Sequence, residues 1–298
     1  PFDGKKSGRV WRCLRQSLGR RLQEMAVRTD RAANADELRL VHSEDYLAEL
    51  RSSSYVANVL EVPAVRYWPH WIVNHNLLRP LRWATRGTIL AAQEALEHGF
   101  AVNLGGGFHH ARPDRGEGFS VYQDIGIAVR VLVRDGKIDK GSRIVYIDTD
   151  AHQGNGVCHT FRDDKNIYIF DVFNYRIYPA FDKQARRRVN CPVSVDFTWT
   201  GSDYLEELKL ALPAFLDYAS ESPVAFAIYN AGYDVYRDDP LGGLQLSAEA
   251  IKQRDVFVVE ELRRRGIPTM MVLSGGYTPD SHQLVVQSLM AIISEGLQ

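Results

Sequence analysis

The chain has 298 residues, which is near the upper limit for one hydrophobic core, so we expect a single domain over residues 1–298. Its 36 lysine and arginine residues nearly balance 37 aspartate and glutamate residues, and this charge of -1 argues against direct binding to nucleic acid or to an anionic membrane. Three scattered cysteines do not form a disulfide framework or a thiolate zinc site, and no apolar run approaches the ~20 residues of a membrane span, so we expect an intracellular protein, cytoplasmic or, in a eukaryote, nuclear.

The N-terminal quarter, residues 1–75, predicts helical pieces joined by loops. Two of them are 8–22 and 44–51, the second with Ser43 as its N-cap. The segment 62–78 is rich in aromatic side chains, which we expect to pack beneath a loop. No catalytic pattern is evident in this part of the chain.

From residue 85 onward, helices and strands alternate. The predicted helices are 85–98, 121–134, 202–219, 247–265 and 281–295, and the predicted strands are 100–104, 143–150, 167–172, 189–195, 223–230 and 268–273. This alternation is typical of an α/β fold with an open parallel sheet and helices on both faces. In such sheets ligands bind at the carboxyl ends of the strands, where the polar clusters of this sequence fall.

The densest polar cluster follows strand 143–150. The period of two along a strand places Asp148 and Asp150 on the same side, and Asp150 with His152 forms an Asp-x-His chelate of oxygen and nitrogen that suits zinc, among other divalent metals. With Asp234 the site would have three protein ligands and a position open for water, as in catalytic zinc sites. A metal ion acidifies such a water, so the pattern predicts metal-assisted hydrolysis of an amide.

Two histidines and a tyrosine at the same edge supply the remaining chemistry. His109 and His110 follow the glycine run 105–107 and are candidates for the acid and the base. The hydroxyl of Tyr277 can donate to the oxygen on which negative charge develops. Each feature is common by itself, since adjacent histidines in a loop are usually incidental, and the prediction therefore rests on their joint occurrence.

These motifs resemble those of the zinc-dependent histone deacetylases, and specifically the class IV, or histone deacetylase 11-like, branch. The matching stretches cover nearly the whole chain and are 1–3, 78–82, 105–110, 114–116, 150–156, 229–232, 238–244 and 274–277. The resemblance implies the three-layer αβα fold of arginases and deacetylases. It also implies one zinc ion per chain and, as substrate, an Nε-acyl-lysine on a protein or peptide, with acetyl or long fatty acyl groups removed.

The resemblance also assigns roles to single residues. The family's zinc ligands match Asp150, His152 and Asp234. His110 matches the general base that later acts as the acid, His109 its electrostatic companion, and Tyr277 the residue that polarises the carbonyl. Asp148 is expected to accept a hydrogen bond from His109, and Asn155 one from His110. Class I enzymes have aspartate at the position of Asn155, whereas class IV enzymes have asparagine.

Further positions match the substrate channel and a structural ion site. Gly118 and Phe119 match residues that line the acyl-lysine channel, while 174–181 does not reproduce the aromatic pattern of class I, so the opposite wall stays unassigned. A structural potassium or sodium ion would be held by Asp148, Asp150, His152, Asp171 and Val172. We expect the other histidines to be structural or solvent-facing, namely His42, His70, His75, His98, His159 and His282. The basic run 186–188 is expected to be solvated surface.

Three alternative functions have to be compared with the hydrolysis of acyl-lysine. Two-metal enzymes of the arginase type carry a carboxylate where this chain has Gly154 and another where it has Gly232, so the second metal has no ligands here. An acetylpolyamine deacetylase often uses an acidic gate near the position of Leu241, and leucine cannot select a cationic substrate. A binding module without catalysis would not need the complete set of ligands, histidines and tyrosine. Acyl-chain length, the protein substrate and the oligomeric state stay open.

The asparagine behind His110 leads to a first prediction. A neutral amide stabilises the imidazolium less than a carboxylate does, so His110 should rest neutral as a base. Asn155→Asp should therefore raise the pKa of His110 and move the acidic limb of the pH–rate profile to higher pH. An acidic limb at the same pH in both proteins would contradict this assignment of the base.

Overall fold

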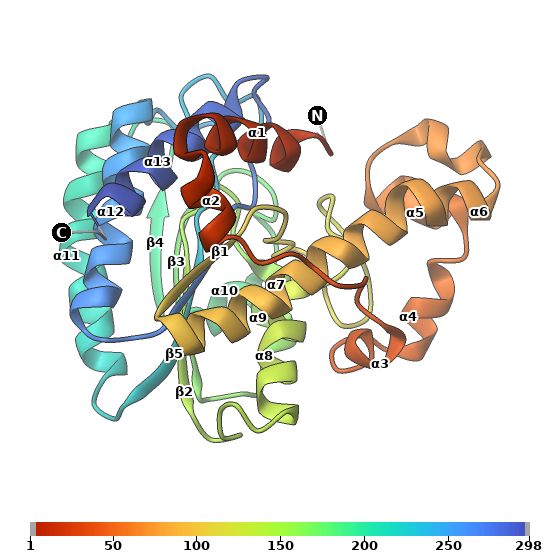
Figure 1. Ribbon diagram of the computed structural model, residues 1–298, viewed down its shortest axis with the longest axis horizontal. Helices are drawn as coiled ribbons and strands as arrows, with labels where there is room; N and C mark the ends of the chain where they lie inside the picture. The colour runs from red at the N-terminus through yellow and green to blue at the C-terminus, as the bar shows by residue number, and fades with distance from the viewer. Residues whose placement is uncertain (1–3, 296–298) are drawn as a thin grey trace.

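The computed structural model describes residues 4–295, and within them the chain forms a sheet of six strands in which every neighbouring pair is parallel (Figure 1). The strand order is β1-β6-β5-β2-β3-β4. The strands are β1 (Phe100–Asn103), β2 (Arg143–Asp148), β3 (Ile167–Asn174), β4 (Cys191–Val195), β5 (Val224–Asn230) and β6 (Thr269–Val272). Each strand coincides with one expected from the sequence, which confirms the parallel α/β prediction.

Helices cover both faces of the sheet (Figure 1). One face packs against α7 (Arg79–His98) and α8 (Asp124–Arg134), beyond which lie the short helices α3 (Ala35–Leu38), α4 (Glu44–Glu49), α5 (Ser53–Val59) and α6 (His70–Val73). The other face packs against α1 (Lys6–Leu18), α2 (Arg20–Met25), α11 (Gly201–Ala219), α12 (Ala248–Arg264) and α13 (Ser281–Glu295). None of the helices described in residues 4–295 is long and apolar enough to cross a membrane.

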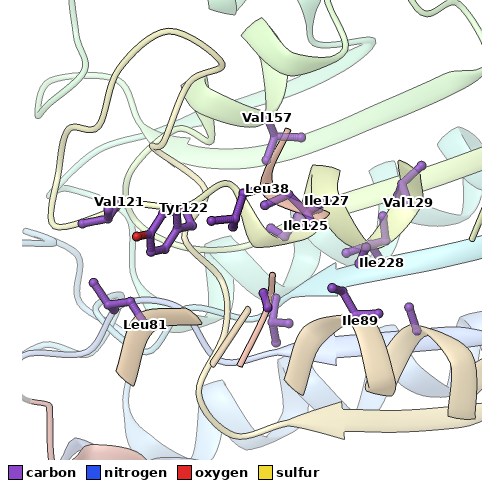
Figure 2. Close-up of a cluster of buried hydrophobic side chains, with 14 of the residues drawn as sticks. Leu38, Leu81, Ile89, Val121, Tyr122, Ile125, Ile127, Val129, Val157 and Ile228 are labelled. Atoms are coloured by element: carbon purple, nitrogen blue, oxygen red, sulfur yellow. The ribbon is translucent and has the colours of Figure 1, made fainter. Parts of the chain in front are cut away.

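Alternation along the strands separates two hydrophobic cores. In β2, Tyr146 belongs to the core beneath α7 and α8, whereas Val145 and Ile147 belong to the core beneath α11 and α12. Figure 2 shows the first core, where Ile89 of α7 and Ile125 of α8 point toward Ile228 of the sheet. Because both faces of every central strand are covered, the strands read as nearly continuous apolar runs. The three-layer αβα arrangement follows from this pattern.

The register of the central strands brings polar residues together at one edge. Asp148 at the end of β2 lies opposite Asp171 of β3 and opposite Asn230 of β5. All three side chains are buried. Since parallel strands have their carboxyl ends at the same edge, this row of polar groups marks the edge at which a ligand is expected.

The aromatic segment 62–78 differs from the prediction. Tyr67 is 82% exposed and Trp71 is 70% exposed, so the expectation that these rings pack beneath a loop is wrong. The segment consists of the 3-10 turn η1 (Pro63–Tyr67), α6 and the π-helical turn η2 (Asn74–Leu78), and its inward positions are taken by valine and leucine side chains. The smaller apolar residues fill the core, and the rings are left at the surface.

Two short helices escaped the sequence analysis, α9 (Asn155–Thr160) and α10 (Lys183–Arg188). Asp182 caps α10 by accepting a hydrogen bond of 3.0 Å from the backbone N–H of Ala185. Arg188 donates to three backbone carbonyls, so the basic run 186–188 is not simply solvated surface as expected. Cys13, Cys158 and Cys191, all among the described residues, are free thiols.

A buried ion pair connects α12 to the carboxyl end of the sheet. Arg254 and Asp255 are both fully buried, and the guanidinium Nη2 lies 2.7 Å from Asp255 Oδ1. Arg254 also donates to the backbone carbonyl of Thr149, which follows β2, at 3.0 Å. The hydroxyl groups of Tyr229 and Tyr233 donate to Asp255 at 2.5 and 3.0 Å. The Arg254–Asp255 pair therefore fixes the segment that follows β2, through Thr149, and the end of β5 with the residues after it, through Tyr229 and Tyr233.

Removal of one partner should be costly for stability. Arg254→Met leaves Asp255 as an uncompensated buried charge, so we expect the free energy of unfolding to fall by about 3–5 kcal/mol. Arg264→Met is a matched control, because Arg264 is 67% exposed and its pair with Glu261 should contribute only about 0–1 kcal/mol. Urea unfolding of the two variants measures both values. Equal losses would show that burial does not determine the contribution of the pair.

Candidate active site

The three predicted metal ligands converge at the carboxyl edge of the sheet. Asp150, His152 and Asp234 each offer a ligand atom, and these atoms all lie within 4.8 Å of one another. His152 Nδ1 is 2.7 Å from Asp234 Oδ2 and 3.3 Å from Asp150 Oδ1. Asp150 and His152 follow β2, and Asp234 follows β5, the neighbouring strand. Among the described residues, this is the group of acidic, histidine or cysteine side chains that could hold a metal ion.

The electrostatics of these three side chains fit a cation. Although burial lowers the pKa of His152, its hydrogen bonds to the two carboxylates outweigh burial and raise the pKa to about 10. Burial and the neighbouring charge of Asp150 raise the pKa of Asp234 to about 7. The two carboxylates thus share one positive partner, and a metal ion that binds here competes with a proton. Two carboxylates and one imidazole suit zinc and several other divalent metals.

The two histidines of the glycine-rich loop lie beside this group. His109 Nδ1 is 2.9 Å from Asp148 Oδ2, and His110 Nδ1 is 2.8 Å from Asn155 Oδ1, so both hydrogen bonds expected from the sequence are present. The rings are 4.1 Å apart between centroids. The phenol of Tyr146 and the side-chain amide of Asn230 also donate to Asp148, two partners that the sequence analysis did not identify.

The two histidines have opposite electrostatic environments. Burial by itself lowers the pKa of His109, but the charges of Asp148 and Asp150 raise it to about 9. Burial and the charge of His109 hold the pKa of His110 well below its usual range. At neutral pH one ring is therefore cationic and the other is neutral, which separates an electrostatic role from a role as base.

Tyr277 belongs to a loop that reaches the site from β6. Its backbone N–H donates to Asp239 Oδ2 at 2.7 Å, and Gly275 N–H donates to Asp150 Oδ2 at 2.9 Å. Lys6 of α1, which no sequence pattern indicated, donates to the carbonyls of Ser274 and Gly275 at 2.6 and 2.8 Å. Burial lowers the pKa of this lysine to about 8. The first helix thus fixes the loop that carries the tyrosine.

A cavity of about 860 Å³ opens beside His109, His110 and Tyr277. Gly118 and Phe119, the predicted channel residues, line it, and the Phe119 ring lies 5.7 Å from the Tyr277 ring. Its lining also includes the apolar residues Leu60, Leu77, Pro80, Leu81 and Leu104, together with the polar residues Lys5, Lys6, Ser7 and Asn76. Leu241 is not among the lining residues and lies in a neighbouring loop, where its N–H donates to Asp239.

Tyr178, in the segment that the sequence left unassigned, contacts His110. Its ring stands edge-on to the His110 ring at 5.0 Å. The prediction missed this residue because 174–181 lacks the class I aromatic pattern, although the single tyrosine next to Pro179 was available as a signal. Tyr178 is 44% exposed, so its ring contacts His110 from the solvent side.

Glycine occupies both positions at which a two-metal enzyme of the arginase type has a carboxylate for its second metal. A Cβ atom at Gly154 would lie 2.6 Å from Asp148 Oδ2, and one at Gly232 would lie 2.3 Å from the Cα of Asp150. Gly232 also has a positive φ of 57°, a conformation that disfavours side chains. A side chain at Gly154 would displace the carboxylate of Asp148, and one at Gly232 would require movement of the backbone, so this geometry does not fit the two-metal arrangement.

The predicted site for a monovalent cation contains a buried carboxyl group. Asp171 accepts a hydrogen bond from Gly154 N–H at 3.1 Å through Oδ2, while its Oδ1 has no hydrogen-bond partner among the described residues. Burial, together with the charge of Asp148, raises the pKa of Asp171 well above its usual range. A cation or a proton would stabilise this oxygen, so the residues fit the ion, which stays a prediction for Asp148, Asp150, His152, Asp171 and Val172 alike.

A polar network behind His110 was also missed. Asn155 Nδ2 donates to Glu117 Oε1 at 2.6 Å, and Arg112 Nε donates to the same oxygen at 2.6 Å. Asp182 accepts from Arg112 at 2.5 Å and lies 2.8 Å from His159 Nε2. His159 is thus structural, as expected, whereas Glu117 was not among the residues predicted for the site.

Comparisons with known proteins were made on sequence and on structure. Residues 1–293 match the family described as the histone deacetylase domain. Histone deacetylase 2 of Arabidopsis thaliana is 41% identical over 298 residues, covering 100% of this chain and 74% of that protein. An acetylpolyamine aminohydrolase from Burkholderia pseudomallei superposes with a TM-score of 0.74 at 19% identity, over 97% of this chain and 90% of that chain. The HD domain of HDA15 superposes with a TM-score of 0.69 at 18% identity, over 98% and 86%. These similarities confirm the predicted fold.

The close approach of Gly275 to two carboxylates permits a test of the metal group. A Cβ atom there would lie 2.6 Å from Asp234 Oδ2 and 2.7 Å from Asp150 Oδ2, so Gly275→Ala should displace both oxygens. We expect the affinity for Zn²⁺ to fall by about 10–100-fold, measured by competition with a chromophoric chelator. Gly141→Ala is the control, because a Cβ there meets nothing within 4 Å. Unchanged affinity in Gly275→Ala would show that the ion binds elsewhere.

Proposed function

Because the chain belongs to the histone deacetylase domain family, we propose that it hydrolyses the amide of an Nε-acyl-lysine on a protein or peptide. The observation that carries this proposal is the convergence of Asp150, His152 and Asp234 next to the histidine pair, which lines one cavity together with Tyr277. One zinc ion on the three ligands would acidify water and polarise the acyl carbonyl. A potassium or sodium ion near Asp171 would have a structural role.

The chain's own residues divide the proton chemistry between them. His110, which is neutral, accepts a proton from the attacking water and returns it to the departing lysine amine. His109 stays cationic beside Asp148 and lowers the energy of the negative charge that develops on the substrate. Burial, and then the charge of Asp234, raise the pKa of Tyr277, which keeps its hydroxyl protonated as a donor to the carbonyl oxygen.

The cavity supports a substrate longer than acetyl-lysine. Its leucine and proline lining beyond the catalytic residues suits a hydrocarbon chain, because apolar surface is favourably removed from water there. We therefore propose long-chain deacylation alongside deacetylation, which agrees with assignment to the class IV branch. Asparagine at position 155, where class I enzymes have aspartate, supports the same branch.

A second candidate is the hydrolysis of acetylated polyamines. It is favoured by the structural similarity to an acetylpolyamine aminohydrolase, although at 19% identity that similarity concerns the fold alone. None of the described residues that line the cavity is acidic, and Lys5 and Lys6 are among them, so the cavity offers no negative charge for a cationic substrate and we rank this candidate second.

One assay separates these functions. The zinc-loaded protein is tested on one peptide that carries acetyl-, octanoyl- or myristoyl-lysine, and on acetylated polyamines. We expect turnover of the peptides, and Tyr277→Phe should lower kcat by about 10²–10³-fold with little change in KM, because its hydroxyl acts mainly in the transition state. Turnover of polyamines alone would favour the second candidate. Turnover of nothing, or turnover indifferent to Tyr277, would reject the proposal.

A further inference from the structure

We propose that Glu117 is a positioning residue that orients the side-chain amide of Asn155 and thereby selects which nitrogen of His110 carries the proton. This inference rests on the proposed function, in which His110 accepts a proton from water. Glu117 touches neither His110 nor the metal ligands in any hydrogen bond found among the described residues, so its effect would pass through Asn155.

The amide of Asn155 is held from both ends. The side chain is fully buried, its Oδ1 lies 2.8 Å from His110 Nδ1, and its Nδ2 lies 2.6 Å from Glu117 Oε1. A second carboxylate oxygen, Asp182 Oδ2, lies 3.4 Å from the same Nδ2. Ionised carboxylates only accept hydrogen bonds, so the end of the amide that faces them must be the NH₂ group.

The opposite orientation of the amide is strongly disfavoured. It would place Asn155 Oδ1 against Glu117 Oε1 at the distance of a hydrogen bond, although neither oxygen carries a proton. Buried acceptors without donors are costly, and Asn155 has no access to water that could relieve the contact. Arg112 donates to both carboxylates, at 2.6 Å to Glu117 and 2.5 Å to Asp182, and so holds them in place.

The orientation of the amide determines the tautomer of His110. Since Asn155 Oδ1 can only accept, Nδ1 of the neutral ring must carry the proton and donate it. Nε2 is then the nitrogen left to accept a proton from water. A reversed amide would donate to Nδ1 and move the ring proton to Nε2, which would remove the base. The tautomer depends on which amide atom faces Nδ1, and not on the pH at which the ring gains its second proton.

The side chain at position 155 needs an outer residue to orient it because it is an asparagine, and an aspartate would not need one. A carboxylate at position 155 presents an oxygen to Nδ1 in either orientation, so it needs no outer residue to orient it. Glu117 would then face a second negative charge at about the distance now spanned by its hydrogen bond to Nδ2, and the two would repel each other. The effect of Glu117 on catalysis should therefore depend on the residue at position 155.

A double-mutant cycle tests this dependence through kcat and KM for an acyl-lysine peptide. Glu117→Met removes the acceptor at similar size, and we expect kcat to fall about 10-fold with KM unchanged. Glu117→Gln retains an oxygen that can accept from Asn155 and Arg112, so it should rescue most of the activity. In the Asn155→Asp background the sign should reverse, and Glu117→Met should raise kcat relative to Asn155→Asp alone.

A readout independent of activity separates this inference from the proposed function. In protein with ¹⁵N-labelled histidine, the His110 resonances should report a proton on Nδ1 in the wild type and in Glu117→Gln, but not in Glu117→Met. If no substrate is turned over and the tautomer still depends on Glu117, the inference stands and the proposed function fails.

Other outcomes would overturn the positioning role. They are an unchanged tautomer in Glu117→Met, equal impairment of the Met and Gln variants, or additive effects in the cycle. Thermal unfolding of each variant shows whether a loss of kcat reflects loss of the fold, in which case the tautomer of the folded fraction decides. A structural role of the loop would change KM and stability without reversing sign at position 155.

Discussion

The concentration of buried carboxyl groups at one edge of the sheet is the constraint on which the rest of the site depends. Asp148, Asp150, Asp171 and Asp234 are all within 1% of complete burial. Burial of like charges at short range is unfavourable unless protons, cations or hydrogen-bond donors offset it. The surrounding groups do this, since His109 and His152 have raised pKa values and Lys6 is brought in from the first helix. A divalent cation would meet the same need more strongly.

The scaffold places these charges by register and holds them by contacts from distant parts of the chain. The parallel pairing of β2 with β3 and β5 sets Asp148 between Asp171 and Asn230. Arg254 of α12 and Lys6 of α1 then hold the segments that follow β2 and β6 through backbone carbonyls. The chemistry therefore depends on both helical layers, and not only on the loops that carry the ligands.

Local patterns were sufficient to predict the strands and the Asp150-x-His152 motif, because apolar periodicity and ligand spacing are properties of short stretches. Asp234 could be added because it follows another predicted strand, and parallel strands have their carboxyl ends at one edge of the sheet. Local patterns could not predict which side chains that are distant in the sequence form hydrogen bonds in the fold. Lys6 contacts a carbonyl 268 positions away, and Glu117 meets Asn155 across 38 positions. The prediction that the aromatic rings of segment 62–78 pack beneath a loop was wrong for another reason. Hydrophobicity indicates which residues can be buried. In this segment Val65 and Val73 occupy the inward positions, and Tyr67 and Trp71 lie at the surface.

The glycines around the metal group bear on how a protein of this kind can diverge. Any substitution at Gly232, Gly242 or Gly275 adds at least one carbon atom within 3.0 Å of a ligand residue, so a mutation there must displace part of the metal group whatever the substrate. Phe119 and Tyr178 are instead partly exposed, and neither is one of the proposed metal ligands. Changes at such exposed positions can therefore alter the choice of substrate while the metal group keeps its geometry.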